Sequence, residues 1–473
     1  MKSMNTKNTI LSLLIVLGIL LLPSCDDYLS VVPKGQKIPV TLEDFALMLK
    51  DEYGAHRVDA SQAIILMNDR HVSSSDLSYY PLYKANYNWD ETADRIDLNK
   101  SDEQPFYVGY EAISVFNLVI ENAPEATEAT EEERRSVVAQ SKVLRAMSYF
   151  NIVNYYSDTY VASTAADKGG IPIITSANVN AEYTQPSVQE VYDFILQDMQ
   201  EAYADLPNNG ETILHPDKGT ADAFYARLYL QLGNYTEALE YAERALNAND
   251  ALYDWTEFYE THKAIIEDPE NHNTRLPSPM GFNYVENYNF RHGSVSYQST
   301  ERNLTLDRME YFEDGDARAA ARWKLYNIGG ESYYRSTMNG FYNYGGITTV
   351  EVYLIKAECL ARTGKVEEAM DVVNKVRQKR IISSNFEPLT ATTEAEAVPI
   401  IIKLKGNELI LTQIPFMDAR RLNAEGEYFV TRSKEVGGNI ITLLHNSHLW
   451  TMPFPQGAVD NPGNGTISQN VLK

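Results

Sequence analysis

The stretch FYARLYLQLGNYTEALEYAERAL, residues 224–246, contains a pattern that returns later in the chain. It aligns without gaps to the region around ECLARTGKVEEAM, residues 358–370, at an offset of 131 positions. The alignment pairs Ala226 with Ala357, Gly233 with Gly364, Glu237 with Glu368 and Ala238 with Ala369. Each copy therefore predicts two helices joined by a glycine turn, with small residues where the helices touch.

Helical hairpins of this kind are typical of tetratricopeptide repeats, although the usual closing proline is missing here. A single hairpin cannot bury its apolar face alone, so the two units are expected to stack as a discontinuous scaffold. We therefore expect a mainly α fold, a tetratricopeptide-like scaffold of helical hairpins with long irregular insertions.

Other helices are marked by capping boxes, in which a Ser or Thr precedes an acidic residue by three positions. The boxes pair Thr41 with Asp44, Thr130 with Glu133, and Ser187 with Glu190. Apolar residues then recur at steps of three and four, at Ala139, Val143, Ala146, Phe150 and Val153, and again along 188–206. The helical scaffold is expected to include residues 107–156, 187–248 and 348–380.

Two insertions, at about 68–105 and 250–345, are rich in aromatic residues and show no clear period. Long irregular segments in a compact domain are usually functional, and binding residues concentrate in them. The candidate ligand contacts are Tyr79, Tyr80, Tyr83, Tyr87, Asn88, Trp89, Tyr284, Tyr288, Arg291 and Tyr297.

The choice rests on the chemistry of tyrosine, of which the chain has 32. A tyrosine ring has a flat apolar face and a polar tip, and it suits sugars or peptides at a wet surface. The alternative is that each tyrosine fills a polar-rimmed helical core. For Trp89 the alternative is packing of its loop against the helices.

The first 24 residues predict a secretory signal peptide. Lys2 and Lys7 are the only charged residues before Cys25, and residues 10–22 are almost entirely apolar. As a helix this run reaches only about 20 Å, short of the roughly 30 Å bilayer core. LPSC, residues 22–25, looks like a bacterial lipobox, which predicts that Cys25 is acylated and anchors the protein. The alternative is a soluble secreted protein with an accidental cysteine.

These features divide the chain into a signal peptide at 1–24, a lipidated tether at 25–40 and a single domain at 41–473. The formal net charge of −24 argues against nucleic acid as a partner, because binding a phosphate backbone needs a cationic surface. It also argues against attachment to anionic lipid through surface charge, so the lipid must do the holding.

No enzyme is expected. The chain has neither a glycine-rich phosphate loop nor a Gly-x-Ser-x-Gly elbow. His445 and His448 have a spacing that suits metal on a helix, but no third ligand follows, so we expect neither a metal site nor a cofactor. With Cys25 lipidated, Cys359 is the one remaining thiol and is expected to be a small core residue.

The chain resembles the SusD/RagB family of outer-membrane nutrient-binding lipoproteins of Bacteroidetes over nearly its whole length. The order and spacing of several segments carry the resemblance. They include SCDDYLSVVPKGQ (24–36), SKVLRAMSYFNIVNYYSD (141–158), GGIPI (169–173), SVQEVYDFILQDMQEAYADLP (187–207), GTADAFYARLYLQLGNYTEALEYAERAL (219–246), YFEDGDARAAARW (311–323), EVYLIKAECLARTGKVEEAMDVVNKVRQKR (351–380) and MPFPQGAVDNPGNGTISQN (452–470).

The resemblance implies a cell-surface lipoprotein that captures oligosaccharides, or peptides, and delivers them as a lid to a TonB-dependent, SusC-like barrel in the outer membrane. It implies that Asp26 and Asp27 are a surface-export signal and that the two insertions carry the ligand site. The alternatives are a structural tetratricopeptide scaffold of the cell envelope and a surface glycoside hydrolase.

One segment departs from the family pattern. NELILTQIPFMDARRLN, residues 407–423, has Thr412 and Gln413 in place of a Glu-Gly pair and Pro415 in place of an arginine. A proline inside a helix removes a hydrogen bond, so Pro415 is expected to kink this helix.

Overall fold

The computed structural model describes residues 39–99, 104–270, 274–293, 301–436 and 438–471. The chain divides into residues 1–40 and 41–473, and every helix and strand of the described residues belongs to the second part. The predicted signal peptide, Cys25, Asp26 and Asp27 lie outside the described residues. None of the helices within the described ranges is long and apolar enough to span a bilayer.

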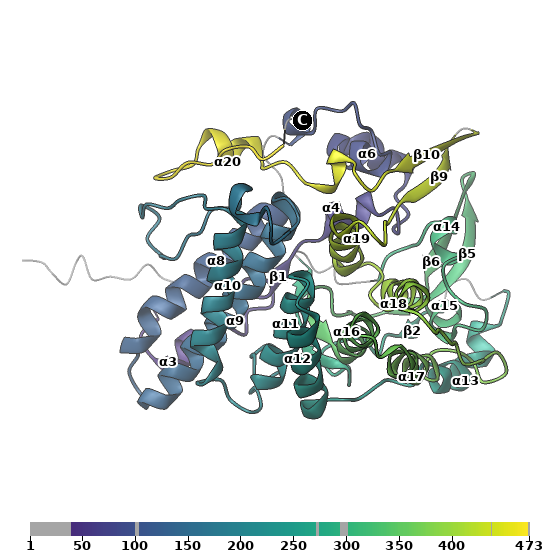
Figure 1. Cartoon of the computed structure of the whole chain (residues 1–473), viewed down its shortest axis with the longest axis horizontal. Helices are drawn as coiled ribbons and strands as arrows, with labels where there is room; N and C mark the ends of the chain where they lie inside the picture. The colour runs from purple at the N-terminus through teal and green to yellow at the C-terminus, as the bar shows by residue number, and fades with distance from the viewer. Residues whose placement is uncertain (1–38, 100–103, 271–273, 294–300, 437, 472–473) are drawn as a thin grey trace, which may run out of the picture. The chain divides into compact units, whose positions relative to one another are not determined.

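The first half of the domain contains a layer of long helices with the short helix α3 beside them (Figure 1). Its members are α3 (Leu42–Met48), α8 (Gln104–Asn122), α9 (Glu131–Tyr156) and α10 (Val188–Tyr203). α9 packs against both α8 and α10. All three predicted capping boxes are present, and the predicted core face of α9 is buried. Helix start signals therefore located α3, α9 and α10 in the sequence.

The sequence repeat is a repeat of structure. α11 (Lys218–Gln231) and α12 (Tyr235–Ala248) form the first hairpin, and α16 (Thr349–Arg362) and α17 (Val366–Arg377) form the second. α16 begins and ends 131 residues after α11. The two turn glycines have φ of 75° and 83°, a left-handed conformation that favours glycine. The four aligned alanines are fully buried where the helices touch, so the repeat prediction is confirmed.

The hairpins continue into two further helices. α12 packs on α16, and α16 packs on α17 and on α18 (Glu394–Glu408). α19 (Ile414–Glu425) follows after a break at Leu411, whose φ is 64°. The expected kink at Pro415 is wrong, because α19 begins just before it. A proline in the first turn costs no helical hydrogen bond.

The two insertions contain more regular structure than their sequences indicate. The first holds α5 (Ser74–Tyr79), α6 (Pro81–Tyr87) and α7 (Arg95–Leu98), and it follows β1 (Arg57–Val58) and α4 (Ser61–Leu66). These helices have one or two turns, too few to show a period. The expectation of a wholly irregular segment was therefore wrong here.

The second insertion mixes helices with short strand pairs. The helices are α13 (Trp255–Ile266), α14 (Leu306–Met309) and α15 (Ala317–Arg322). β2 (Leu276–Pro277) pairs with β7 (Met338–Asn339), β3 (Asn287–Asn289) with β8 (Ile347–Thr348), and β4 (His292–Gly293) with β1. β5 (Trp323–Ile328) and β6 (Glu331–Ser336) form an antiparallel hairpin.

Near the C-terminus, β9 (Arg432–Val436) and β10 (Asn439–Leu443) form a second antiparallel hairpin, and α20 (Gln456–Asp460) follows.

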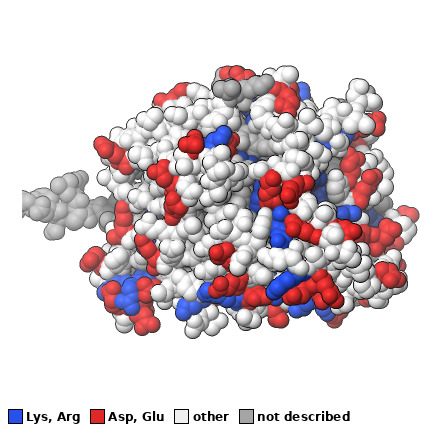
Figure 2. Space-filling view, viewed as in Figure 1, with Lys and Arg blue, Asp and Glu red and all other residues white. Residues whose placement is uncertain are grey.

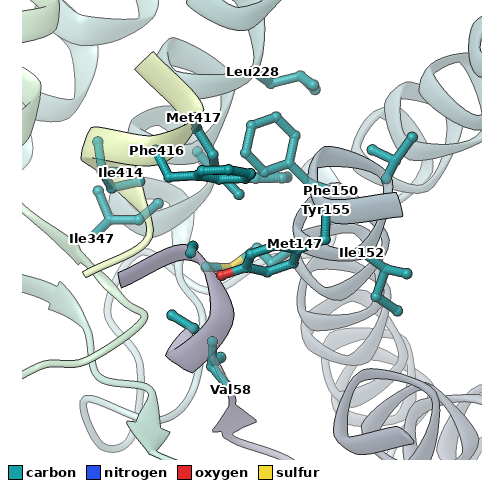
Figure 3. Packing of buried hydrophobic residues seen from close by; sticks show 14 of the residues in the cluster. Val58, Met147, Phe150, Ile152, Tyr155, Leu228, Ile347, Ile414, Phe416 and Met417 are labelled. Atoms are coloured by element: carbon teal, nitrogen blue, oxygen red, sulfur yellow. The ribbon is translucent and has the colours of Figure 1, made fainter. Parts of the chain in front are cut away.

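The core lies where α9, α11 and α19 meet, and Figure 3 shows residues of all three helices packed together. Tyr155 of α9 stacks on Phe416 of α19 with ring centroids 5.7 Å apart. Phe150 meets Phe224 of α11 edge to face at 5.5 Å. Cys359 is fully buried, as expected for a core residue.

Buried ion pairs cross the helix interfaces. Arg227 of α11 donates two hydrogen bonds of 2.7 Å to the Glu351 carboxylate of α16. Arg421 of α19 binds the Glu358 carboxylate of α16 in the same two-pronged way, at 2.8 and 2.9 Å. Burial acts to raise the pKa of Glu358, but Arg421 and Arg362 outweigh it and lower that pKa to about 2. The Glu358 carboxylate therefore stays ionised inside the scaffold.

Replacing one partner of the α11–α16 pair is expected to be strongly destabilising. Arg227→Met leaves the Glu351 charge buried and unpaired, which costs roughly 3–5 kcal/mol of unfolding free energy. The double variant Arg227→Met/Glu351→Leu should recover much of the loss. The matched control is Lys356→Ala on α16, which breaks a half-exposed pair with Glu243 of α12 and should cost less than about 1 kcal/mol. Equal losses for Arg227→Met and Lys356→Ala in urea unfolding would contradict this account.

Alanine substitutions at two glycines should change stability in opposite directions. Gly364 has φ of 83° and open space around its Cα, so Gly364→Ala adds only backbone strain and should cost about 1 kcal/mol. Gly406 lies in α18 with no such φ and equally open space, so Gly406→Ala should gain about 0.5–1 kcal/mol. Thermal and denaturant unfolding measure both, and the same sign for the two variants would be inconsistent with the strain argument.

Candidate binding site

Three tyrosines of the first predicted cluster form a group at the junction of α5 and α6, in which Tyr79 and Tyr80 are exposed and Tyr83 is half-buried. Tyr80 ends α5 and starts α6, where Pro81 takes the first helical position. The Tyr79 ring lies 4.8 Å from the Tyr80 ring, nearly perpendicular to it, and the Tyr80 ring lies 5.3 Å from that of Tyr83. Tyr79 is 77% exposed and Tyr80 49%. We call Tyr79, Tyr80 and Tyr83 the aromatic platform.

The platform is tied to the β5–β6 hairpin. The Ser74 hydroxyl at the start of α5 donates to a Glu331 carboxylate oxygen at 2.7 Å. Hydrogen bonds from Ser74 hold the pKa of Glu331 below its usual value, so this acceptor is ionised at neutral pH. Close by, the His71 ring stacks on Tyr333 with centroids 4.2 Å apart. These contacts fix the position of a helix too short to hold itself.

The other members of the first cluster turn inward. The Trp89 side chain is buried, and its indole N–H donates to the Leu66 carbonyl at 2.7 Å. The rings of Tyr87 and Trp89 lie 4.1 and 4.7 Å from the Lys434 ammonium, which comes from β9. Burial lowers the pKa of Lys434 to about 8 and raises that of Tyr87 to about 12. Asn88 caps α6 and is half-buried. Trp89 therefore packs its loop against the helices, which was the alternative to a ligand contact.

The second predicted cluster does not form a surface group. Tyr288 is 7% exposed and donates to the Asn249 carbonyl at 2.6 Å; Arg291 is 1% exposed and donates to the Ser148 hydroxyl at 3.0 Å. The half-buried Tyr284 ring packs against Tyr253 at 5.5 Å. Tyr297 lies outside the described residues.

The surface position expected for Tyr288 and Arg291 was therefore wrong. β3, which contains Tyr288, is paired with β8, and every residue of β3 is buried. Burial lowers the pKa of Arg291 to about 9. In Figure 1, α6 lies near the top and α13, beside Tyr284, at the lower right. The platform and the second cluster do not form one site.

Sequence reasoning missed the residues around the first cluster: His71, Ser74, Glu331 and Tyr333 beside the platform, and Lys434 against Tyr87 and Trp89. Ser74 and Glu331 are 257 positions apart, and no local pattern links them. Only the Ser73 helix cap and Pro81 gave a usable signal, for the two short helices themselves.

The described residues contain no group of three or more His, Cys, Asp or Glu side chains placed to hold a metal ion. His448 lies 2.7 Å from the Glu91 carboxylate, and the His445 ring packs on Phe429 at 4.0 Å. Figure 2 shows acidic side chains spread over the visible face, with no continuous basic patch among its described residues. The site can therefore offer flat rings and hydroxyls to a ligand.

Comparisons with known proteins agree on one family. The family model for SusD-like proteins, described as "Starch-binding associating with outer membrane", matches residues 27–230. SusD-like protein P2 of Formosa agariphila is 24% identical over 398 residues, which cover 73% of this chain and 76% of the relative.

Solved structures share the fold. A SusD superfamily protein from Bacteroides thetaiotaomicron is 18% identical with a TM-score of 0.69, and the match covers 91% of this chain and 100% of that one. A laminarin-binding SusD-like protein is 16% identical with a TM-score of 0.59, covering 92% and 100%. The family model and the relative show that this chain is similar to SusD-like proteins, and the solved structures show that it has their helical fold.

Proposed function

We propose that this protein captures glycans at the cell surface and delivers them to a TonB-dependent outer-membrane barrel, for which it acts as a lid. It binds without turnover. The family model that matches residues 27–230 is described as starch-binding and associating with the outer membrane, which supports the first part. One solved relative binds laminarin, so laminarin is the first ligand to try.

The observation that carries the proposal is the exposure of the aromatic platform. Tyr79 leaves 77% of its surface in water although its ring is large and apolar, a cost that a bound ligand removes. The neighbouring rings are tilted by 76° and 36°, so they present several faces in different directions. Sugar C–H faces stack on such rings, and the phenol hydroxyls serve the sugar hydroxyls.

Delivery to a barrel requires that the lid stay on the membrane. The predicted lipid on Cys25 supplies the anchor, and a net charge of −24 makes electrostatic attachment to anionic lipid unfavourable. Asp26 and Asp27 would direct the lipoprotein to the outer face.

Removing the platform rings should weaken glycan binding. Tyr79→Ala/Tyr80→Ala should lower the affinity for laminarin at least ten-fold, equivalent to about 1.4 kcal/mol, with little change in unfolding free energy because both rings are exposed. Titration calorimetry and affinity electrophoresis measure the loss.

Tyr53→Ala is the matched control. Tyr53 is an exposed tyrosine whose ring contacts His292 and neither α5 nor α6. If wild-type protein binds no member of a broad glycan panel, the proposed function fails. If it binds and the double variant binds equally well, the platform assignment fails.

Cys25→Ala should release the protein from the membrane fraction of a native host, whereas Cys359→Ala, which removes the buried thiol, should not. Detergent-solubilised wild-type protein should bring down a TonB-dependent barrel in near-equimolar amount. Purification of the anchored protein alone would count against the lid.

Asp26→Asn/Asp27→Asn tests the export signal. This variant should keep its lipid but should no longer be cleaved by protease added to intact cells.

A further inference from the structure

A second candidate site lies away from the platform, between α8, residues 172–183 and residues 457–467. These three segments enclose a cavity of about 400 Å³. Four aromatic residues line it: Phe106, Tyr107 and Tyr110 from α8, and Tyr183 from the middle segment. Its volume is within the range of about 300–1,000 Å³ typical of small-ligand pockets.

Hydrogen bonds between the three segments fix the cavity walls. The Tyr110 hydroxyl donates to the Pro172 carbonyl at 2.7 Å, and the Asn117 amide donates to the Ile174 carbonyl at 2.8 Å. The Tyr183 hydroxyl donates to the Pro462 carbonyl. The Tyr183 ring also lies against Gly465, where an added Cβ would come within 2.4 Å of it. The cavity is therefore pre-formed rather than created by its ligand.

The lining has no charge. Every residue that lines the cavity is Phe, Tyr, Ile, Ser, Asn, Pro, Ala, Val or Gly, in a chain of which 22% is charged. Burial raises the pKa of the Tyr110 hydroxyl, so this phenol also stays neutral. An ionised ligand would lose water here and gain no counter-charge, which costs several kcal/mol. The cavity therefore selects neutral ligands.

The polar groups of the lining are of the kind that binds hydroxyls. Asn461 and Asn464 use their amide N–H groups on the Gly457 and Asn180 carbonyls. Their side-chain oxygens accept no hydrogen bond from the described residues, and Ser114 on the rim is exposed. Tyr107 and Tyr110 are three residues apart on α8 and so lie on one helix face. Flat tyrosine rings beside amide oxygens that can accept hydrogen bonds fit a ligand ring with apolar faces and hydroxyl groups at its edge.

We propose that this cavity is a second carbohydrate site and that it takes a neutral sugar unit, not a uronic acid or a sulfated sugar. The inference rests on the proposed function for its ligand class, but not on the platform, because none of the platform residues lines the cavity. In Figure 1, α8 and α20 lie on the left of the view and α6 on the upper right. A glycan chain can therefore engage the protein at two separate places.

The test is calorimetric titration with short laminarin oligosaccharides as the neutral probe, compared with galacturonic acid oligomers as the charged probe. The wild-type protein should bind two neutral molecules per chain. Tyr107→Ala should leave one bound molecule, because Tyr107 lines the cavity. Tyr107 is 37% exposed, so its replacement should not unfold the domain. Ser114→Trp should also leave one, by filling the cavity from its rim. Tyr79→Ala/Tyr80→Ala should leave the cavity site, and Tyr53→Ala should leave both.

The outcomes separate the two proposals. If one site is found, lost with the platform variant and unchanged by Tyr107→Ala and Ser114→Trp, the cavity proposal fails and the proposed function stands. If the wild-type protein binds no neutral glycan of the panel, both fail. If galacturonic acid oligomers bind the wild-type protein as tightly as the neutral probe, and Ser114→Trp abolishes that binding, the proposed selection for neutral sugars is wrong.

Discussion

Arginine–carboxylate pairs buried between helices set the geometry on which the rest of the protein depends. Arg145 joins α9 to Asp198 of α10, Arg227 joins α11 to α16, and Arg421 joins α19 to α16. Such a pair need not add much stability over an apolar contact, but a shift of one helix would leave a charge unpaired in the core. We infer that these pairs fix the helix register. The helices that position the tyrosine sites therefore keep a fixed register relative to one another.

The parts of the fold that could be predicted are those encoded locally. A capping box involves four residues, and the repeat shows itself in alanines and a glycine whose spacing is read directly. The kink expected at Pro415 was wrong because the effect of a proline depends on where the helix starts. The helix starts at Ile414, after the left-handed backbone of Leu411 breaks the preceding one. α13 was missed inside a segment without clear period, although Asp254 caps it by accepting hydrogen bonds from two backbone N–H groups. Where a helix depends on its neighbours, its own residues give a weak signal.

The candidate site shows the same limit more strongly. Aromatic richness indicated the segment that contains Tyr79, Tyr80 and Tyr83, but composition cannot say which rings face water. Trp89 and Tyr288 also combine an aromatic ring with a polar N–H or O–H group, yet both are buried. In each case a backbone carbonyl of another element accepts the hydrogen bond that water would otherwise accept. The cavity beside α8 depends on three segments that meet only in the folded chain. Exposure is a tertiary property, and the sequence carries it only indirectly.

The large insertion starts and ends at nearly the same place. The Tyr353 hydroxyl of α16 donates to the Asp250 carbonyl, and the Thr349 hydroxyl donates to the Ala251 carbonyl. Because its two ends are already held together, changing the length of the segment between them costs little closure entropy, about 0.6 kcal/mol for each doubling. Its surface turns, such as the one between β5 and β6, can therefore change in length at little cost. Its buried residues Tyr288 and Arg291 are constrained instead, because they hold contacts with Asn249 and with Ser148 of α9.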